Sequence, residues 1–479
     1  MSPSEISRRT VLRGAALGAA VLASGADSLL GKSVQAPPNI VFILADDMGY
    51  ADISCYGRPD LRTPNIDNLA SRGMRFLQAY ANSAVCSATR TALITGRYQD
   101  RLDVGLDEPL VGRDTGLPPS HPTLPSLLRK AGYGTTLVGK WHLGLLPKYG
   151  PLLSGYDHFY GFRGGAVDYF THSNDLWDED IKVQQVGYLT DILGSHAVNV
   201  ITGYSQARKP FLLSLHFNAP HWPWEGPGDE AESRRLNGHR LTDFDGGSQA
   251  TYRRMIEDLD LQVGRVHEAL RAGGILDNTI VIFTSDNGGE RFADTWPFTG
   301  RKTELLEGGL RIPAIISWPV RIALGQTTNQ VAISMDWLPT LLAAAGTGLD
   351  AAYPPDGINL LPFLAEGATP VARKLFWRYK ANAQRAMRDG DMKYLKILEN
   401  TFLFNVVEDP MERANLKERM PDDYNRLIAE WAAWNAAMLP EIDASYTDNF
   451  TGDELADHIG TTGTSHKADN PPPLAAPHR

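Results

Sequence analysis

The stretch Asn39-Ile-Val-Phe-Ile-Leu-Ala-Asp-Asp47 decides the fold, because it is an unbroken apolar run that ends in two carboxylates. Strands that are apolar on both faces belong to parallel sheets covered by helices, and ligands bind outside the carboxyl ends of such strands. We therefore predict a buried parallel strand with Asp46 and Asp47 at its carboxyl end. Adjacent carboxylates repel each other unless a cation lies between them, and their oxygens suit Ca²⁺ or Mg²⁺. The alternative is a turn with a solvated Asp pair.

A second apolar run has the same form. It reads Thr279-Ile-Val-Ile-Phe-Thr-Ser-Asp286-Asn287-Gly-Gly, and it too ends in oxygen-bearing side chains. Asp-Asn-Gly alone is most often a turn, but after a buried strand we interpret Asp286 and Asn287 as metal ligands. The two pairs would supply about four ligands of a shell of about six, which leaves room for a substrate oxygen and a nucleophile.

Two further segments place basic side chains after predicted strands. The strand Thr135–Gly139 leads into Lys140 and His142, which point the same way on an extended chain because they are two residues apart. The strand Phe211–Phe217 leads into His221, on a loop rich in Pro and Trp. Each side chain by itself could be solvated or incidental. Their shared position at strand ends favours one common pocket.

The stretch Ser83-Ala-Val-Cys-Ser-Ala-Thr-Arg-Thr-Ala-Leu-Ile-Thr-Gly-Arg97 places a potential nucleophile, Cys86, four residues before a cation, Arg90. If a helix begins just after Cys86, both side chains lie on one face, and the helix N-terminus adds partial positive charge. Such a pocket suits an anion. The alternatives are a small buried thiol or a disulfide with Cys55, the only other cysteine.

These motifs together resemble the type I sulfatases of the alkaline phosphatase superfamily. The run C-S-A-T-R-T-A-L-I-T-G-R from Cys86 matches their signature, and G-K-W-H-L-G and G-R-K-T-E follow in the family order. The resemblance extends over roughly residues 39–416. It implies that a maturation enzyme oxidises Cys86 to formylglycine, whose hydrate is the nucleophile. Ala88 stands where Pro is commoner, which leaves open which maturation system converts Cys86.

The resemblance implies the hydrolysis of a sulfate monoester, an aryl sulfate or a sulfated carbohydrate, to an alcohol and inorganic sulfate. The implied cofactor is Ca²⁺, with Mg²⁺ as an alternative. Arg90 and Lys140 would position the hydrate, His221 and Lys302 would face the bridging oxygen with His221 as general acid, and His142 would assist sulfate release. The implied ligand set is Asp46, Asp47, Cys86, Asp286 and Asn287, and the implied catalytic set is Cys86, Arg90, Lys140, His142, His221 and Lys302.

The loop Gly161–His172 is rich in glycine and aromatic residues and could line a sugar or aryl subsite. We take Asp168 and His172 from this loop as candidate substrate contacts. Tyr169, Trp222 and Trp224 are compatible with stacking on a sugar ring, and equally with packing in the interior.

Composition excludes several classes of protein. The chain has 479 residues, 43% of them hydrophobic, a formal net charge of −10 and a pI near 5.7, which disfavours nucleic acid or an anionic membrane as a partner. Two cysteines without C-x-x-C spacing are too few for a disulfide scaffold or a structural zinc site. No stretch approaches the ~18 apolar residues needed to span a bilayer.

The N-terminus carries an export pattern. Ser7-Arg-Arg-Thr-Val-Leu12 is a twin-arginine motif, and a small apolar run follows from Gly14 to Ala26. We predict a Tat signal over residues 1–36, which makes the Tat machinery a partner and places the mature protein in the periplasm or outside the cell.

The predicted fold class is α/β, with a large, mostly parallel central sheet flanked by helices over residues 37–362. A smaller antiparallel sheet with a helix would occupy 363–440, and 441–479 would form an extension with a disordered tail. A polar surface insertion is expected at Ser233–Gly247, followed by a long helix at Ala250–Ala272. The strands expected in the small unit are Leu375–Lys380, Gln384–Arg388, Met392–Leu398 and Leu403–Val406, and its helix is Asp422–Met438.

Two other functions fit the same residues. A phosphate mono- or diesterase of the same superfamily could use the same metal and cations, because they would serve phosphoryl transfer too. If Cys86 is not converted, the chain could instead bind sulfated glycans without turning them over.

Overall fold

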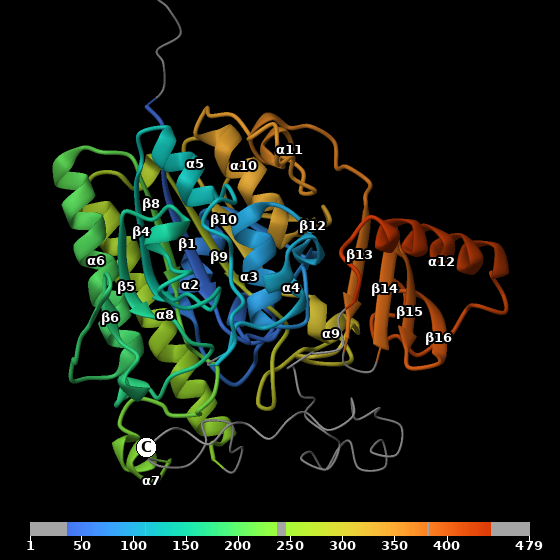
Figure 1. Cartoon of the computed structure of the whole chain (residues 1–479), viewed down its shortest axis with the longest axis horizontal. Helices are drawn as coiled ribbons and strands as arrows, with labels where there is room; N and C mark the ends of the chain where they lie inside the picture. Colours follow the sequence, from blue (N-terminus) through green and yellow to red (C-terminus); the bar gives the residue numbers. More distant parts are fainter. Residues whose placement is uncertain (1–35, 111, 237–245, 381–382, 442–479) are drawn as a thin grey trace, which may run out of the picture. The chain divides into compact units, whose positions relative to one another are not determined.

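The computed structural model describes residues 36–110, 112–236, 246–380 and 383–441 (Figure 1). The expected export signal and nearly all of the expected tail lie outside these residues. Among the described residues, no helix has the length and apolar character that a bilayer crossing requires. The residues described from Pro38 onward belong to one compact unit that contains the ten-stranded, the four-stranded and the two-stranded sheet. The boundary that we place between residues 362 and 363 stays a prediction.

A ten-stranded sheet forms the centre, in the order β11-β2-β10-β9-β1-β8-β4-β5-β6-β7. Its middle is parallel: β1 (Asn39–Ala45) lies between β9 (Thr279–Ser285) and β8 (Phe211–His216), and β4 (Gly134–Lys140) and β5 (His158–Phe162) continue beyond β8. The antiparallel pairings lie toward the two edges. The outer strands are β2 (Met74–Phe76), β10 (Ala314–Ser317), β11 (Gln326–Thr328), β6 (Trp177–Asp178) and β7 (Ile181–Lys182). The predicted mostly parallel sheet is confirmed.

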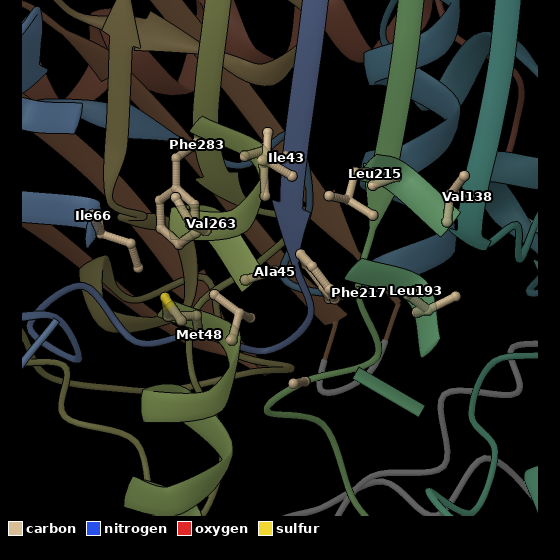
Figure 2. Close-up of a cluster of buried hydrophobic side chains, with 14 of the residues drawn as sticks. Ile43, Ala45, Met48, Ile66, Val138, Leu193, Leu215, Phe217, Val263 and Phe283 are labelled. Carbon is tan, nitrogen blue, oxygen red and sulfur yellow. The ribbon is translucent and has the colours of Figure 1, made fainter. Parts of the chain in front are cut away.

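Helices cover both faces of this sheet. One face packs against α2 (Pro64–Ser71), α6 (Leu189–Ala207) and α8 (Gln249–Ala272), in the cluster that Figure 2 shows around Ile43 and Phe283. The other face packs against α3 (Cys86–Thr95), α5 (Leu124–Lys130), α10 (Trp337–Ala344) and α11 (Leu361–Glu366). Successive side chains of β1 alternate between the two clusters, which explains why its sequence is apolar without a break. Val41, Ile43 and Ala45 belong to the first cluster, and Ile40, Phe42 and Leu44 to the second.

Several short elements connect these layers. The surface insertion expected at Ser233–Gly247 begins inside a helix, α7 (Glu230–Leu236), in which Arg234 and Arg235 are exposed. Ser233 is the exception, because it is buried and its hydroxyl donates to the Asp168 carboxylate at 2.9 Å. Residues 237–245 lie outside the described residues, so the rest of this expectation stays a prediction. The remaining short elements are β3 (Ala79–Tyr80), paired with β12 (Ala332–Ile333), α4 (Asp103–Leu106), α9 (Glu307–Leu310), and 3-10 turns at Ser54–Tyr56, Gln99–Arg101, Leu152–Ser154, His172–Asn174, Leu276–Asn278 and Ser334–Asp336.

The smaller antiparallel sheet is also confirmed. Its strands are β13 (Lys374–Tyr379), β14 (Gln384–Asp389), β15 (Met392–Ile397) and β16 (Asn400–Asn405), and α12 (Pro421–Ala436) follows. The last strand begins three residues before the predicted Leu403. It does so because Asn400 pairs with Ile397 across a two-residue turn in which Leu398 takes φ 52°. Neither turn residue is the Gly or Asn that usually marks such a hairpin.

A buried ionic network joins the smaller antiparallel sheet to α9 and β3. The Nζ of Lys393, on β15, lies 3.0 Å from Glu307 Oε1 and 2.9 Å from Glu412 Oε1. Glu307 begins α9 and also accepts a hydrogen bond from the Tyr80 hydroxyl at 2.7 Å. Burial alone would raise the pKa of Glu307, but Lys393 and Arg311 lower it to about 2. The charge of Lys393 therefore stabilises the junction.

The substitution Lys393→Met should destabilise the protein, because it takes the cation away from the buried Glu412 and leaves the buried Glu307 with Arg311 alone. We expect a loss of about 3–5 kcal/mol in the free energy of unfolding, measured by chemical denaturation. The matched control is Lys396→Met on the same strand, whose partner Glu399 is exposed, and which should change that free energy by about 0.5 kcal/mol or less. Equal losses in the two variants would contradict the role of Lys393.

Candidate active site

Sheet register brings two acidic pairs together. Ala45 of β1 is the partner of Ser285 of β9, so the residues that follow each of them leave the sheet side by side. The backbone N–H of Asp47 donates to Asp286 Oδ1 at 3.2 Å, and the Asn287 side-chain amide donates to Asp47 Oδ1 at 2.7 Å. Asp47 takes φ 62°, in the left-handed region. The predicted meeting of the two strand ends is confirmed.

Each carboxylate faces a cation. Lys140 Nζ lies 2.5 Å from Asp46 Oδ2, and Lys302 Nζ lies 2.6 Å from Asp47 Oδ2. Arg90 Nε completes the set at 2.9 Å from Asp286 Oδ2. Burial alone would lower the pKa of Lys140 and of Lys302, but the neighbouring carboxylates raise both, so both stay charged. Three buried acids and three buried bases are therefore matched at one edge of the sheet.

Cys86 is the first residue of α3, and Val85 is the N-cap. The thiol is 3% exposed, and burial raises its pKa to about 12, although Lys140 and Lys302 act in the opposite direction. An unmodified Cys86 is therefore a protonated thiol at neutral pH, and a poor nucleophile. Neither Cys86 nor Cys55 is in a disulfide, so the disulfide alternative was wrong.

The oxygen atoms at this edge fit a hard cation. Asp46, Asp47, Cys86 and His221 each offer one ligand atom, and these atoms all lie within 4.8 Å of one another. Asp46 Oδ1 and Asn287 Oδ1 are buried and have no hydrogen-bond partner among the described residues. Buried acceptors without a partner are costly, and a bound ion would satisfy them. Carboxylate and amide oxygens are the ligands that Ca²⁺ and Mg²⁺ prefer.

His221 lies next to this cluster. Its Nδ1 is 2.6 Å from the Trp222 carbonyl oxygen, so Nδ1 carries the proton, and its Nε2 is 3.4 Å from Asp47 Oδ2. Burial, together with Lys302 and Lys140, lowers the pKa of His221 well below its ordinary value. The ring is therefore neutral here, and a bound anion would favour its protonated form. Its role as general acid stays a prediction.

His142 also lies close to Cys86. It takes φ 56°, and its Nε2 is 3.3 Å from Glu108 Oε1. Ligand atoms of Cys86, Glu108 and His142 lie within 4.8 Å of one another. Burial, followed by the charge of Lys140, lowers the pKa of His142 well below its ordinary value. Sequence reasoning missed Glu108, because it belongs to a short Asp-Glu-Pro segment that carries no motif.

His216 is a second residue that sequence reasoning missed. It ends β8, and its Nδ1 lies 3.5 Å from Arg90 Nη1 and 3.3 Å from the Lys140 carbonyl oxygen. Burial lowers the pKa of His216 to about 3, so the ring stays neutral beside the guanidinium. The available signal was its place as the last residue of an apolar strand at the edge where the predicted site lies.

The two candidate substrate contacts, Asp168 and His172, make hydrogen bonds that hold loops together. Asp168 accepts the N–H groups of Phe170 at 2.8 Å and Thr171 at 2.6 Å, and His172 Nε2 lies 3.2 Å from the Gly187 carbonyl oxygen. These contacts are with loop groups rather than with the acids and cations of the site. Their substrate role stays a prediction. Trp224 is buried, so it packs in the interior.

Neighbouring residues of the same loops, Tyr169 and Tyr188, hold the loop that carries His221. The Tyr169 hydroxyl donates to the His221 carbonyl oxygen at 2.9 Å, and the Tyr169 N–H donates to Glu225 Oε2 at 3.0 Å. The Tyr188 hydroxyl donates to the Glu225 carbonyl oxygen at 2.8 Å. Burial, with the nearby Asp168, raises the pKa of Glu225 to about 9, so this side chain is neutral at physiological pH.

Known proteins share this sequence and fold. A family model described as Sulfatase matches residues 38–347. The chain is 33% identical to N-acetylgalactosamine-6-sulfatase of Homo sapiens over 392 residues, which are 74% of this chain and 71% of that protein. It is 30% identical to arylsulfatase A of Homo sapiens, over 72% of this chain and 71% of that protein. The solved structure of Ps i-CgsB in complex with k-i-k-neocarrahexaose superposes with a TM-score of 0.79 at 28% identity, covering 89% of this chain and 99% of that one.

The substitution Glu225→Gln should reduce the pH dependence of stability. The folded state raises the pKa of Glu225 from 4.5 to about 9, so between these values the folded protein binds more protons than the unfolded one. The contribution of Glu225 to the free energy of unfolding is therefore fully present below pH 4.5 and is lost as the pH rises toward about 9. Gln imitates the neutral acid and does not titrate. The melting temperature of the variant should therefore fall less than that of the native protein when the pH is raised from about 5 to about 9.

The control is Glu399→Gln, on a side chain that is 91% exposed. Its stability should follow the native protein across the same pH range. If Glu225→Gln also runs parallel to the native curve, Glu225 is not a buried neutral acid.

Proposed function

The chain belongs to the sulfatase family, and from that membership we propose that it removes sulfate from a saccharide ester, using a formylglycine made from Cys86 beside a bound calcium ion. Sulfate ester hydrolysis is the activity of the family. The saccharide, the modified residue and the ion are our proposal. The observation that carries it is the placement of Cys86 within 4.8 Å of Asp46, Asp47 and His221, where a nucleophile, acidic ligands and a proton donor can serve one small anion.

The state of the thiol supports modification. A buried group with a pKa of about 12 is not a thiolate at neutral pH, whereas oxidation to an aldehyde gives a hydrate with two hydroxyl groups at the same position. Arg90, on the same face of α3, and Lys140 are placed to stabilise the alkoxide of one hydroxyl. Ala88 in place of the commoner Pro is compatible with more than one maturation system.

The oxygen ligands support a calcium ion. The side chains that would hold it are those of Asp46, Asp47, Asp286 and Asn287. Coordination would give a partner to Asp46 Oδ1 and Asn287 Oδ1, which are buried without a hydrogen bond from the described residues. When bound, such an ion polarises a sulfate oxygen and favours ionisation of the hydrate. Mg²⁺ is the alternative, and the acidic cluster is compatible with either.

The chain's own side chains then divide the work of ester cleavage. Arg90 and Lys140 hold the nucleophilic oxygen in line with sulfur, and Lys302 and His221 face the bridging oxygen, where His221 gives a proton to the departing alcohol. His142, which also lies close to Cys86, accepts the proton of the second hydroxyl as sulfate leaves. Glu108 lies beside His142 and orients its ring.

The substrate class rests on two similarities. N-acetylgalactosamine-6-sulfatase takes its name from a sulfated sugar, and Ps i-CgsB has been solved with a neocarrahexaose. Both favour a sulfated saccharide over a simple aryl sulfate. A phosphate esterase is the rival, and comparing the turnover of an aryl sulfate with that of the matching aryl phosphate separates the two. The twin-arginine motif supports export by the Tat route.

The substitution Cys86→Ala should abolish sulfate release while leaving the fold intact, because it removes the nucleophile but not a buried charge. Released sulfate and the melting temperature are the two measurements. Mass spectrometry of the peptide that contains Cys86 should show a mass ~18 Da below that of the thiol form. Full activity in Cys86→Ala would refute the nucleophile. An unshifted mass in active protein would refute formylglycine.

Removal of divalent cations should also abolish turnover. We expect dialysis against a chelator to reduce activity by about 100-fold or more, because both the acid cluster and the sulfate lose their shared counter-charge. Ca²⁺ should restore activity at lower concentration than Mg²⁺. The control is dialysis against chelator already saturated with Ca²⁺. Unchanged activity in protein proven metal-free by elemental analysis would contradict the metal site.

A further inference from the structure

A cysteine, an acid and a histidine meet beside the cluster of acids and cations. Cys86, Glu108 and His142 each offer one ligand atom, and these atoms lie within 4.8 Å of one another. Cys86 begins α3, Glu108 follows α4 and His142 follows β4, so three segments of the chain build the group. Sulfur, imidazole nitrogen and carboxylate oxygen are together the donors of a zinc ion, whereas calcium takes oxygen ligands. In a chain whose Cys86 is unconverted, these side chains therefore form a second candidate metal site.

The state of His142 points to a missing ligand. Its side chain is 1% exposed, and both of its ring nitrogens are buried without a hydrogen bond from the described residues. Buried polar atoms without partners are costly, so the ring would be stabilised by a ligand at this point. A neutral imidazole offers a nitrogen lone pair, and it is the commonest side-chain ligand of metals in proteins.

The spacing of the three atoms suits a tetrahedral ion. With zinc bonds of about 2.0–2.3 Å, neighbouring ligand atoms lie about 3.3–3.6 Å apart. The distance of 3.3 Å between His142 Nε2 and Glu108 Oε1 already has this value. The distances to the sulfur are at most 4.8 Å, so the Cys86 side chain has to approach by about 1 Å to complete three corners of a tetrahedron.

Glu108 is better placed to serve zinc than the neighbouring acids are. Asp46 and Asp47 each lie within 2.6 Å of a lysine Nζ, and breaking such a buried pair is costly. Among the described residues, the one ion-pair partner of the Glu108 carboxylate is His142. An ion that needs a thiolate, an imidazole and a carboxylate therefore finds them here without displacing a lysine.

Access and charge also favour a divalent ion. The Glu108 side chain is 15% exposed, and it lines a cavity of about 50 Å³ together with Val85 and Ser87, the two neighbours of Cys86. An ion can approach the sulfur along this cavity. The three acids and three bases matched above balance one another, so the thiolate and the Glu108 carboxylate remain to neutralise the two charges of the ion.

We propose that the folded chain with an unconverted Cys86 binds a zinc ion through Cys86, Glu108 and His142, with water as the fourth ligand. Binding releases the thiol proton to solvent, because the thiolate is the form that ligates zinc. Conversion of Cys86 removes the site, since formylglycine has no sulfur. The inference concerns the chain before maturation and goes beyond sulfate ester hydrolysis, so turnover by the mature enzyme does not decide it.

The test is a metal titration of the full chain, produced in cells without a maturation enzyme and shown by mass spectrometry to carry the Cys86 thiol. Calcium is present throughout, so that the site of the oxygen ligands is filled. Co²⁺ serves as the probe, because a tetrahedral cobalt site absorbs visible light and a thiolate ligand adds a charge-transfer band in the near ultraviolet. We expect one equivalent of Co²⁺ to produce both signals and one equivalent of Zn²⁺ to remove them. Protein carrying formylglycine should produce neither.

Substitutions of the three ligands assign the signals. Cys86→Ser should abolish the charge-transfer band. Glu108→Gln and His142→Ala should each weaken zinc binding by about 100-fold or more, since even partners that only orient a metal ligand are worth 10–100-fold in affinity. The melting temperature without metal shows whether each variant folds, and Glu108→Gln, which keeps the shape of the side chain, is the variant expected to fold best.

Two matched controls keep the same residue types outside the site. Cys55→Ser removes the only other thiol. His158→Ala breaks a surface pair in which a histidine nitrogen lies 2.9 Å from Glu179 Oε1 without a cysteine nearby in the sequence. Both variants should keep the cobalt spectrum and a zinc affinity within about twofold of the native value.

Three outcomes would overturn the zinc site. The first is the absence of a charge-transfer band in protein that carries the thiol, and the second is a zinc affinity unchanged by Glu108→Gln. The third is a loss of affinity in His221→Ala but not in His142→Ala, which would place the ion with Asp46 and Asp47 instead. None of these results bears on the release of sulfate by the converted enzyme, which the Cys86→Ala variant tests separately.

Discussion

Charge balance at one edge of the sheet is the constraint on which the remaining structure depends. Asp46, Asp47 and Asp286 are buried, and buried carboxylates are tolerated only with partners. The partners come from Arg90, Lys140 and Lys302, which lie on three different segments of the chain. The central sheet, the helix α3 and the loop that carries Lys302 must therefore all take their correct positions. If one of them is displaced, a buried charge loses its partner. The same balance provides cations for an anionic substrate in a protein whose net charge is negative.

Much of this could be predicted from local sequence. The run from Asn39 to Ala45 is apolar because both of its faces are buried, and any strand with that environment must read the same way. The placement of Arg90 on the same face as Cys86 follows from their four-residue spacing, given a helix at this point, and α3 supplies that helix. Strand order does not follow from local sequence, because nothing within a strand says which strand pairs with it. The side-by-side exit of Asp46 and Asp286 depends on the pairing of Ala45 with Ser285, which only the folded sheet reveals.

The residues that were missed have a common cause. Glu108, His216 and Glu225 all act through contacts with segments distant in sequence. Glu108 and Glu225 belong to no local pattern, and His216 is marked only by its place at the end of an apolar strand. The burial of Ser233 was missed for the same reason, since a polar composition does not reveal a buried partner such as Asp168. Which residues the sequence reveals and which it does not also depends on their function. Ester chemistry depends on strand ends, which the sequence marks clearly, whereas recognition of the alcohol depends on loops, where polar and aromatic residues have many ordinary uses.

The depth of Cys86 has a consequence for when the protein can become active. Its side chain is 3% exposed and its backbone lies in the first turn of a helix, so a modifying enzyme could not draw this segment into its own cleft once the domain has closed. If Cys86 is converted as we propose, the conversion must therefore precede the folding of this domain. A chain that folded first would keep its buried thiol, and the active fraction of a preparation would then report the order of these two events rather than the quality of the finished fold.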